Sequence, residues 1–172
     1  MSISSSQLRK ELVALLPRLR RFALSLTSNG ADGDDLLQAA IERVLAKTPP
    51  EDVALDRWMF RVTKNIWIDE IRARKVRSDD GVKQAIDLHD RPDGVAEIEG
   101  RTELAQVQRL MQKLPDEQRL VLLLIPVEGY SYKEASEILD IPTGTVMSRL
   151  ARARAALASL LDTGDGAMGE ML

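Results

Sequence analysis

The chain has 172 residues, a formal net charge of −3 and 44% hydrophobic residues, so it can hold two small domains that each bury a core. It has no cysteine and a single histidine, His89, which excludes disulfides, thiolate metal sites and a multi-histidine metal centre. No apolar run approaches the roughly 18 residues of a membrane span. The start MSISSSQLRKEL lacks the apolar core of a signal peptide, so we expect a cytoplasmic protein without membrane insertion.

The first predicted helix covers residues 6–26, because leucines and Phe22 recur at steps of three and four residues. Pro17 lies inside this pattern and predicts a kink or a break. After the helix, Gly30 is suited to a left-handed cap and Asp32 to the N-cap of the next helix. That second helix is expected over 34–47, with four apolar side chains facing inward: Leu37, Ile41, Val44 and Leu45.

The loop TPPEDVAL leads to a third predicted helix over 56–76. Residues 57–77 hold seven basic residues against two acidic ones. Five of the cations share one stripe of the helix: Arg57, Arg61, Lys64, Arg72 and Lys75. Such a stripe is typical of a surface that follows a phosphate backbone, and Asn65 at its edge offers both a donor and an acceptor to a base. The alternative for this helix alone is a solvated charged face.

The other faces of the third helix are apolar. One arc is expected to be core: Trp58, Met59, Val62, Ile66 and Ala73. Asp69 falls in that arc, where a lone carboxylate is costly unless an arginine or a helix end pairs with it. A second apolar stripe is expected to pack on the first helix, with a docking surface for a protein partner as the alternative: Phe60, Trp67 and Ile71.

Segment 78–100 holds seven acidic residues against two basic ones, together with glycines and a proline, and it shows no sustained period. We expect an acidic flexible linker here. It separates an N-terminal domain, 1–77, from a C-terminal domain, 101–162, and a frayed tail follows at 163–172. The predicted fold class is all-α, with two small helical domains.

Helical periodicity resumes at residue 101, and Pro115 suits the first turn of a further helix. Ser131 and Glu134 have the spacing of a capping box, which begins a short helix. The turn Asp140-Ile141-Pro142 follows, and Thr143 is placed to cap a second helix that runs to about residue 161. This order of elements predicts a helix-turn-helix.

The second helix of this motif has one buried and one open face at 100° per residue. Val146, Leu150, Ala153 and Leu157 are expected to be buried. The opposite face is made of small residues and one arginine, which suits entry into a DNA major groove: Thr145, Ser148, Ala151, Arg152 and Ala155. Arg149 and Arg154 lie on the flanks, where phosphates pass. A solvated surface helix is the alternative.

Three segments of the chain resemble the extracytoplasmic-function sigma factors of the sigma-70 superfamily. DDLLQAAIERVL (34–45) is similar to the part that binds the β′ clamp helices of RNA polymerase. RWMFRVTKNIWIDEIRARK (57–75) is similar to the segment that melts and reads the −10 promoter element. LPDEQRLVLLL and GYSYKEASEILDIPTGTVMSRLARAR, within 114–154, resemble the part that reads the −35 element and docks on the β flap. The resemblance covers most of the chain.

The resemblance implies a role for several groups of residues. Polymerase-binding side chains are implied at Asp34, Asp35, Gln38 and Glu42. Contacts to the −10 element are implied at Arg61, Lys64, Asn65, Arg72 and Lys75, where Asn65 recognises a flipped-out base in a pocket walled by the loop 48–55. Contacts to the −35 element are implied at Thr145, Ser148, Arg149, Arg152 and Arg154. Two residues depart from the family pattern: Met147 replaces a common basic residue, and Trp67 replaces a smaller side chain, which favours a special partner surface.

The implied protein is a promoter-specific initiation factor that needs no cofactor and has no catalytic residue or metal site. Its expected partners are core RNA polymerase, promoter DNA and an anti-sigma factor, and it is expected to be a monomer when free. One alternative is a sigma-like decoy that sequesters an anti-sigma factor without binding DNA, although such decoys are fused to receiver domains. Another is a one-component helix-turn-helix repressor. No glycine-rich phosphate loop or nucleophile elbow supports an enzyme.

Overall fold

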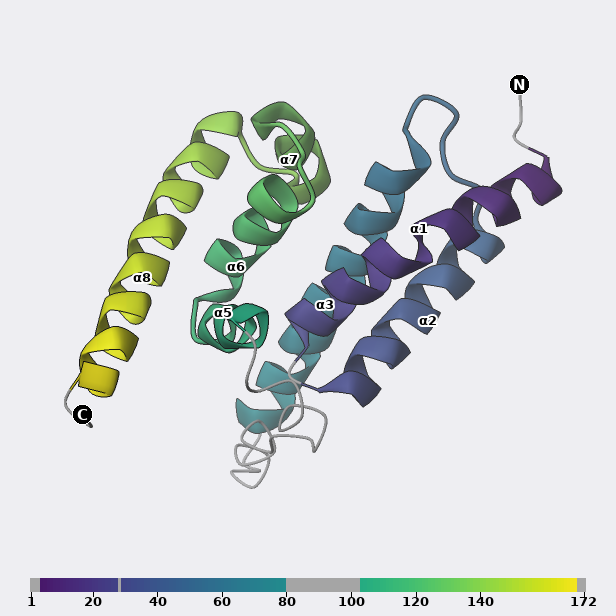
Figure 1. Ribbon diagram of the computed structural model, residues 1–172. Coiled ribbons are helices and arrows are strands. Elements are labelled where there is room, and N and C mark those ends of the chain that lie inside the picture. Colours follow the sequence, from purple (N-terminus) through teal and green to yellow (C-terminus); the bar gives the residue numbers. More distant parts are fainter. Residues whose placement is uncertain (1–3, 28, 80–102, 170–172) are drawn as a thin grey trace. The chain divides into compact units, whose positions relative to one another are not determined.

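The computed structural model describes residues 4–27, 29–79 and 103–169, and this part of the chain is helical without a strand, as predicted (Figure 1). The chain divides into two compact units, and the described residues 4–79 and 103–169 fall into one unit each. No helix in these ranges is long and apolar enough to cross a membrane. The first unit contains α1, α2 and α3, which all pack against one another.

Helix α1 (Ser5–Leu26) begins at Ser4, whose hydroxyl accepts a hydrogen bond from the backbone N–H of Gln7 at 3.2 Å. The helix runs through Pro17 without ending, so the predicted break is wrong. Pro17 is exposed, so the carbonyl group that loses its helical donor lies on the solvent side. Buried side chains before and after it, Leu12 and Leu19, hold both halves of the helix to the core.

Helix α2 (Gly30–Ala46) begins four residues earlier than the sequence indicated. Its N-cap is Asn29, whose side chain accepts the backbone N–H of Asp32 at 2.8 Å, so the predictions of a left-handed Gly30 and an Asp32 cap are wrong. Gly33 allows α1 and α2 to approach closely, because a Cβ there would lie 2.6 Å from Leu24 Cδ2.

The buried face of α2 is rotated from the one predicted. It consists of Gly33, Leu36, Ala40 and Val44. Leu45, which was expected inside, is 55% exposed. The face of α2 that carries Gly33 and Ala40 packs against α1 and α3, and Leu45 lies outside that face.

Helix α3 (Leu55–Asp79) supplies the largest part of this core. The ring of Phe60 packs edge to face against Phe22 of α1, with 4.9 Å between centroids. Trp67 is only 5% exposed, so the hypothesis of a special partner surface at Trp67 is not supported, while Ile71 of the same stripe is half-buried. Residues 72–78 of α3 are all exposed. Ala73 is one of these residues, and Asp69, one turn before it, is exposed as well. Both positions differ from the core arc in which they were predicted.

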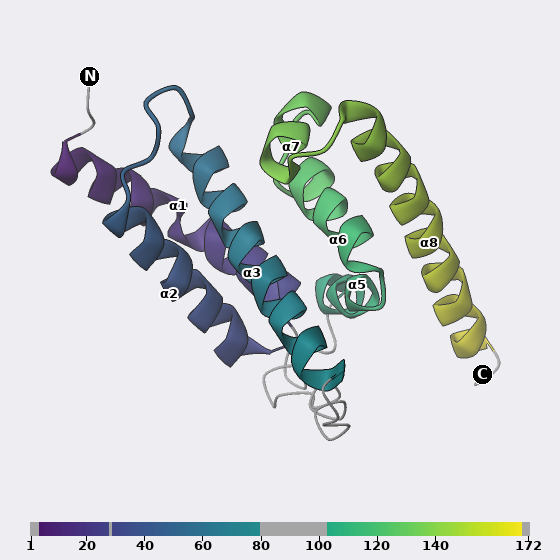
Figure 2. The same ribbon diagram turned by 180° about the vertical axis from the view of Figure 1, so that it is seen from behind.

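The second unit begins with α5 (Glu103–Gln112) and α6 (Asp116–Leu122), and α6 passes into a π-helical segment, Leu123–Val127, that contains Pro126. Pro115 is the N-cap of α6. Helices α7 (Tyr132–Leu139) and α8 (Thr143–Gly169) complete the unit. Figure 2 shows α8 running alongside α6, with α7 near one end of α6 and α5 near the other.

The predicted linker and tail differ from the structure at their edges. Residues 78 and 79 belong to α3, and 80–100 lie outside the described residues. Helix α8 continues to Gly169, so the expectation of a frayed tail is wrong for 163–169. Extending an existing helix adds one hydrogen bond for each residue fixed, and the hydroxyl of Thr163 also donates to the carbonyl of Ser159 at 2.8 Å.

Candidate DNA-binding and protein-binding surfaces

The α2 residues predicted to bind polymerase, three carboxylates and one amide, form one exposed surface. Asp34, Asp35, Gln38 and Glu42 are all exposed. Two of them interact through Gln38 Nε2, which donates to Glu42 Oε1 at 3.2 Å. Asp34 accepts a hydrogen bond from Arg20 Nε of α1, also at 3.2 Å. This surface of α2 therefore offers three exposed carboxylates, two of which, Asp34 and Glu42, accept a side-chain hydrogen bond.

Negative charge also gathers where the N-terminal part of α2 meets α3. Arg74 of α3 lies 3.8 Å from the carboxylate of Asp32. The pKa of Glu70 is raised above its ordinary value of 4.5, chiefly by burial; Arg74 acts against this shift, and the charges of Asp32 and Asp35 add to it. The acidic surface of α2 thus extends onto α3.

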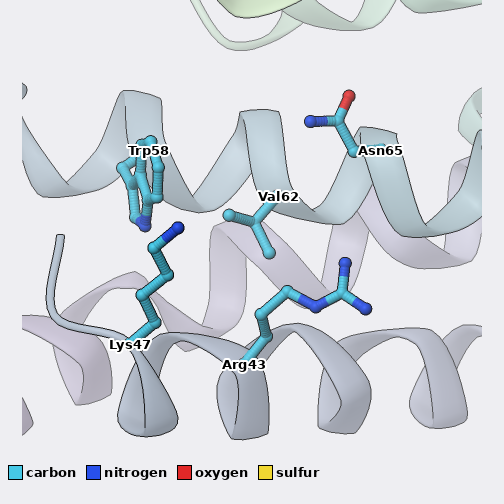
Figure 3. Close-up of a pocket in the computed structure, with 5 residues that line it drawn as sticks. All are labelled: Arg43, Lys47, Trp58, Val62 and Asn65. Carbon is cyan, nitrogen blue, oxygen red and sulfur yellow. The ribbon is translucent and has the colours of Figure 1, made fainter.

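A pocket of about 190 Å³ lies between the C-terminal half of α2 and the N-terminal half of α3. Arg43 and Lys47 line it from α2, and they reach toward the α3 side chains in Figure 3. Trp58, Val62 and Asn65 line it from α3. The pocket therefore combines two cations, an indole ring, an apolar floor and an amide.

This pocket corrects and extends the sequence analysis. Asn65 does stand at a pocket, but the wall comes from α2 and not from the loop 48–55, which contributes no lining residue. Arg43 and Lys47 were missed, and Trp58 was assigned to the core although it is only half-buried. The spacing of Arg43 and Lys47 could have indicated a shared cationic face on α2, because residues i and i+4 lie on the same side of a helix.

The cationic stripe of α3 is interrupted at Lys64. Arg72 and Lys75 are exposed and Arg61 is half-buried, but Lys64 is only 5% exposed, so its predicted place on an open stripe is wrong. Lys64 follows Phe60 by four residues and precedes Trp67 by three, so its stem lies in line with the buried apolar stripe.

The helix-turn-helix has the predicted local structure. The hydroxyl of Ser131 accepts the N–H of Glu134 at 3.1 Å, and the carboxylate of Glu134 accepts the N–H of Ser131 at 2.8 Å, which completes the capping box. Helix α7 ends at Asp140, which adopts a left-handed conformation with φ 55°. The carbonyl of Pro142 accepts the N–H of Val146 at 3.1 Å, so α8 begins one residue earlier than a Thr143 cap requires.

Helix α8 buries three of the four side chains that were predicted to face inward, and the fourth, Leu157, is half-buried. Val146, Leu150 and Ala153 are buried. Ser148, Arg152 and Arg154 are exposed on the other side, while Thr145 is half-buried. Arg149 is half-buried because it turns toward α6, where its Nη2 lies 3.5 Å from Glu117 Oε1. Three of the five predicted DNA-contacting side chains thus lie fully in solvent.

A buried arginine of α6 links α6 to α5 in the second unit. Arg119 of α6 is buried, and it donates to Gln112 Oε1 at 2.7 Å and to Asp116 Oδ1 at 2.8 Å. Burial lowers the pKa of Arg119, and the neighbouring Asp116 acts against that shift. These contacts tie α5 to α6, so we assign Arg119 a structural role.

Among the described residues no three metal-ligating side chains come together.

Family models match both units. The model of sigma-70 region 2 matches residues 12–77, and the model of sigma-70 region 4 matches residues 104–157. The chain is 34% identical to the ECF RNA polymerase sigma factor EcfG of Rhodopseudomonas palustris over 161 residues, covering 91% of this chain and 86% of that relative.

Solved structures show the same fold. The sigma factor RpoE of Bartonella quintana, determined in complex with the anti-sigma factor NepR, has a TM-score of 0.72 at 32% identity, with 90% of this chain and 96% of that chain covered. The stress response regulator PhyR has a TM-score of 0.53 at 27% identity. The alignment with PhyR spans 84% of this chain but 48% of PhyR.

Proposed function

Because this chain belongs to the extracytoplasmic-function sigma factors of the sigma-70 family, we propose that it binds core RNA polymerase and directs initiation at promoters with its own −10 and −35 elements. The observation that carries the proposal is the pocket at Asn65, which supplies a place for a base outside the duplex stack. The two units divide the work, with the −10 element assigned to the first and the −35 element to the second.

The pocket of the first unit has the groups that an extruded nucleotide needs. The Asn65 amide offers a donor and an acceptor to a base edge, and the Trp58 ring offers a stacking face. Arg43 and Lys47 supply positive charge for the flanking phosphates. Base–aromatic stacking contributes about 1–3 kcal/mol. This is comparable to the few kcal/mol that extrusion costs, so capture of the base favours the melted promoter.

The second unit is proposed to read the −35 duplex. In helix-turn-helix proteins the N-terminal residues of the second helix contact base edges. Ser148 and Arg152 occupy the exposed face of α8 and are the proposed base contacts, with Thr145 beside them. Arg149 and Arg154 lie on opposite flanks, where they reach the phosphates of the two strands.

The polymerase contact is assigned to α2. Asp34, Asp35, Gln38 and Glu42 form an exposed acidic surface, and the Arg20–Asp34 ion pair orients its first carboxylate. Acidic side chains attract a basic partner surface and raise the rate of encounter. We place the β′ clamp helices against this surface and the β flap against the second unit. Both assignments follow from membership of the family.

An anti-sigma factor is the proposed regulator, because RpoE was solved with NepR and is similar to this chain over both units. PhyR was also solved as an anti-anti-sigma factor in complex with NepR, so a second candidate function is that this chain sequesters an anti-sigma factor without binding DNA. This chain aligns with about half of PhyR and retains exposed arginines on α3 and α8. We therefore favour the initiation factor.

Transcription in vitro distinguishes the two functions. Core RNA polymerase with the full chain is expected to produce site-selective RNA from a library of genomic fragments, and core alone is not. The Asn65→Ala variant is expected to bind core normally but to lose open complexes, measured by permanganate reactivity of unpaired thymines. Asp69→Ala, an exposed neighbour one turn further along α3, is the matched control and is expected to initiate normally. If the chain is a decoy, neither the wild-type protein nor the Asp69→Ala control will give site-selective RNA with core RNA polymerase.

A further inference from the structure

Met147 stands out on α8, because its apolar side chain is 51% exposed within the first two turns of the helix, beside the face that is proposed to enter the groove. Single exposed hydrophobic residues are common and need no explanation by themselves. Met147 differs because of its position, since it directly precedes Ser148, a proposed base contact. The half of a recognition helix that enters the groove is its N-terminal half.

The surroundings of Met147 leave it open to an approaching duplex. Gly144 lies three residues before it and Ala151 four residues after it, so two of its neighbours along the helix surface are small. A Cβ placed on Gly144 would meet nothing within 4 Å. Side chains on a helix lean toward its N-terminus, so the Met147 side chain is directed toward the turn at Gly144, where space remains open.

Charge indicates what occupies this surface. Arg152 and Arg154 are exposed on α8, and Arg149 lies on its other flank. A surface with these cations suits a polyanion, and within a duplex major groove the apolar group at a base edge is the C5-methyl of thymine. A flexible, polarizable thioether packs well against such a group.

From these observations we propose that Met147 is a specificity-determining residue that contacts the C5-methyl group of a thymine in the −35 element. The proposal rests on the proposed function, because it requires that α8 enters a major groove. It adds a preference for thymine to the polar contacts of Ser148 and Arg152. A protein partner docking on Met147 is the competing occupant, and the experiment below separates the two.

The test removes only the methyl group. The −35 sequence is first selected from random duplexes with the full chain bound to core RNA polymerase, and each thymine on both strands is then replaced by uracil. Burial of one methyl group corresponds to about fourfold in affinity. Wild-type protein is therefore expected to lose about fourfold at one thymine, while Met147→Ala binds the thymine and uracil duplexes equally. Met147→Leu is expected to retain most of the discrimination.

Controls keep the possible failures apart. Val127→Ala removes another exposed apolar side chain of the same unit and is expected to retain the full uracil effect. The proposal would be overturned if uracil weakened the binding of wild type and of Met147→Ala equally, or if uracil had no effect at any thymine. Selective binding to the −35 sequence would still support the proposed function in both cases. A Met147→Ala defect that is independent of the DNA sequence would point to the protein partner and also overturn it. Failure to select any sequence would remove the proposed function itself.

Discussion

The carboxylate of Glu117 on α6 lies 3.5 Å from the guanidinium of Arg149 on α8, so an anion stands beside a cation assigned to the −35 phosphates. The Glu117 side chain is 69% exposed and that of Arg149 is 26% exposed. An ion pair so open to water contributes little to folding, about 0–1 kcal/mol. Its larger effect is on DNA, because Glu117 and a phosphate compete for the same guanidinium.

Replacing Glu117 with glutamine is therefore expected to strengthen binding to the −35 duplex by up to about fivefold at low salt. The gain should shrink in an Arg149→Ala background, because the competition is then gone. Fluorescence anisotropy of a labelled duplex measures both effects with the polymerase-bound chain. Glu137→Gln on α7 is the matched control for overall charge, and an equal gain from it would contradict a local role for Glu117.

The two cations of the α2 pocket wall, Arg43 and Lys47, are expected to affect how the affinity for single-stranded −10 DNA depends on salt. Each phosphate contact to single-stranded DNA adds about 0.7 to the slope of log affinity against log salt. Arg43→Ala and Lys47→Ala should each lower that slope by about this amount for a −10 oligonucleotide bound by the polymerase complex. Arg9→Ala, an exposed cation of α1 outside the pocket, should leave it unchanged. Parallel slopes for all proteins would remove the phosphate role.

Trp67 is expected to act on stability and not on partner binding, because its side chain is only 5% exposed. Truncating a buried tryptophan to alanine costs about 3–5 kcal/mol. Trp58, which is half-buried at the pocket, should cost less when truncated. The chain has two tryptophans and both lie in this unit, so fluorescence during urea unfolding reports on it alone, and each variant keeps one reporter. A Trp67→Ala protein of normal stability would restore the partner-surface hypothesis.

The helix-turn-helix was predictable because its signals are local. Ser131 and Glu134 are three residues apart, and the capping box they form depends only on that spacing. The buried face of α8 follows from a clear apolar period, and Val146 and Leu150 are inside as expected. The resemblance to a known family extended the prediction from fold to function, since local patterns alone left a solvated surface helix open.

The first unit was harder to predict because its details depend on packing between helices. Leu45 and Leu36 are equally apolar, and the packing of α2 against α1 and α3 decides which of them is buried. Lys64 was read as a charge on a stripe, although its spacing from Phe60 and Trp67 places it in the apolar line. Spacing within α2 can place Arg43 and Lys47 on one helix face, but the pocket also requires the register of α2 against α3, which brings that face to Asn65.

Glu70 is expected to make the stability of the first unit depend on pH. Its pKa is raised above the ordinary 4.5, mainly by burial, with Arg74 opposing the shift and Asp32 and Asp35 supporting it. A raised carboxyl pKa means that the folded state binds the proton more strongly than the unfolded state does. The stabilisation is therefore complete below pH 4.5 and is lost as the pH rises through the folded pKa.

At pH 7 the ionised Glu70 thus lowers the stability of the fold, and Glu70→Gln is expected to raise the free energy of unfolding. The gain should stay below about 1 kcal/mol, because Glu70 is only partly withdrawn from solvent and water screens the carboxylate. It should fade when the pH is lowered below 4.5, where the wild-type carboxyl is protonated as well. Urea unfolding followed by tryptophan fluorescence at several pH values measures the difference, and Asp69→Asn controls for the loss of a nearby negative charge. A gain that grows toward acidic pH would reverse the sign and contradict the assignment of burial as the main cause.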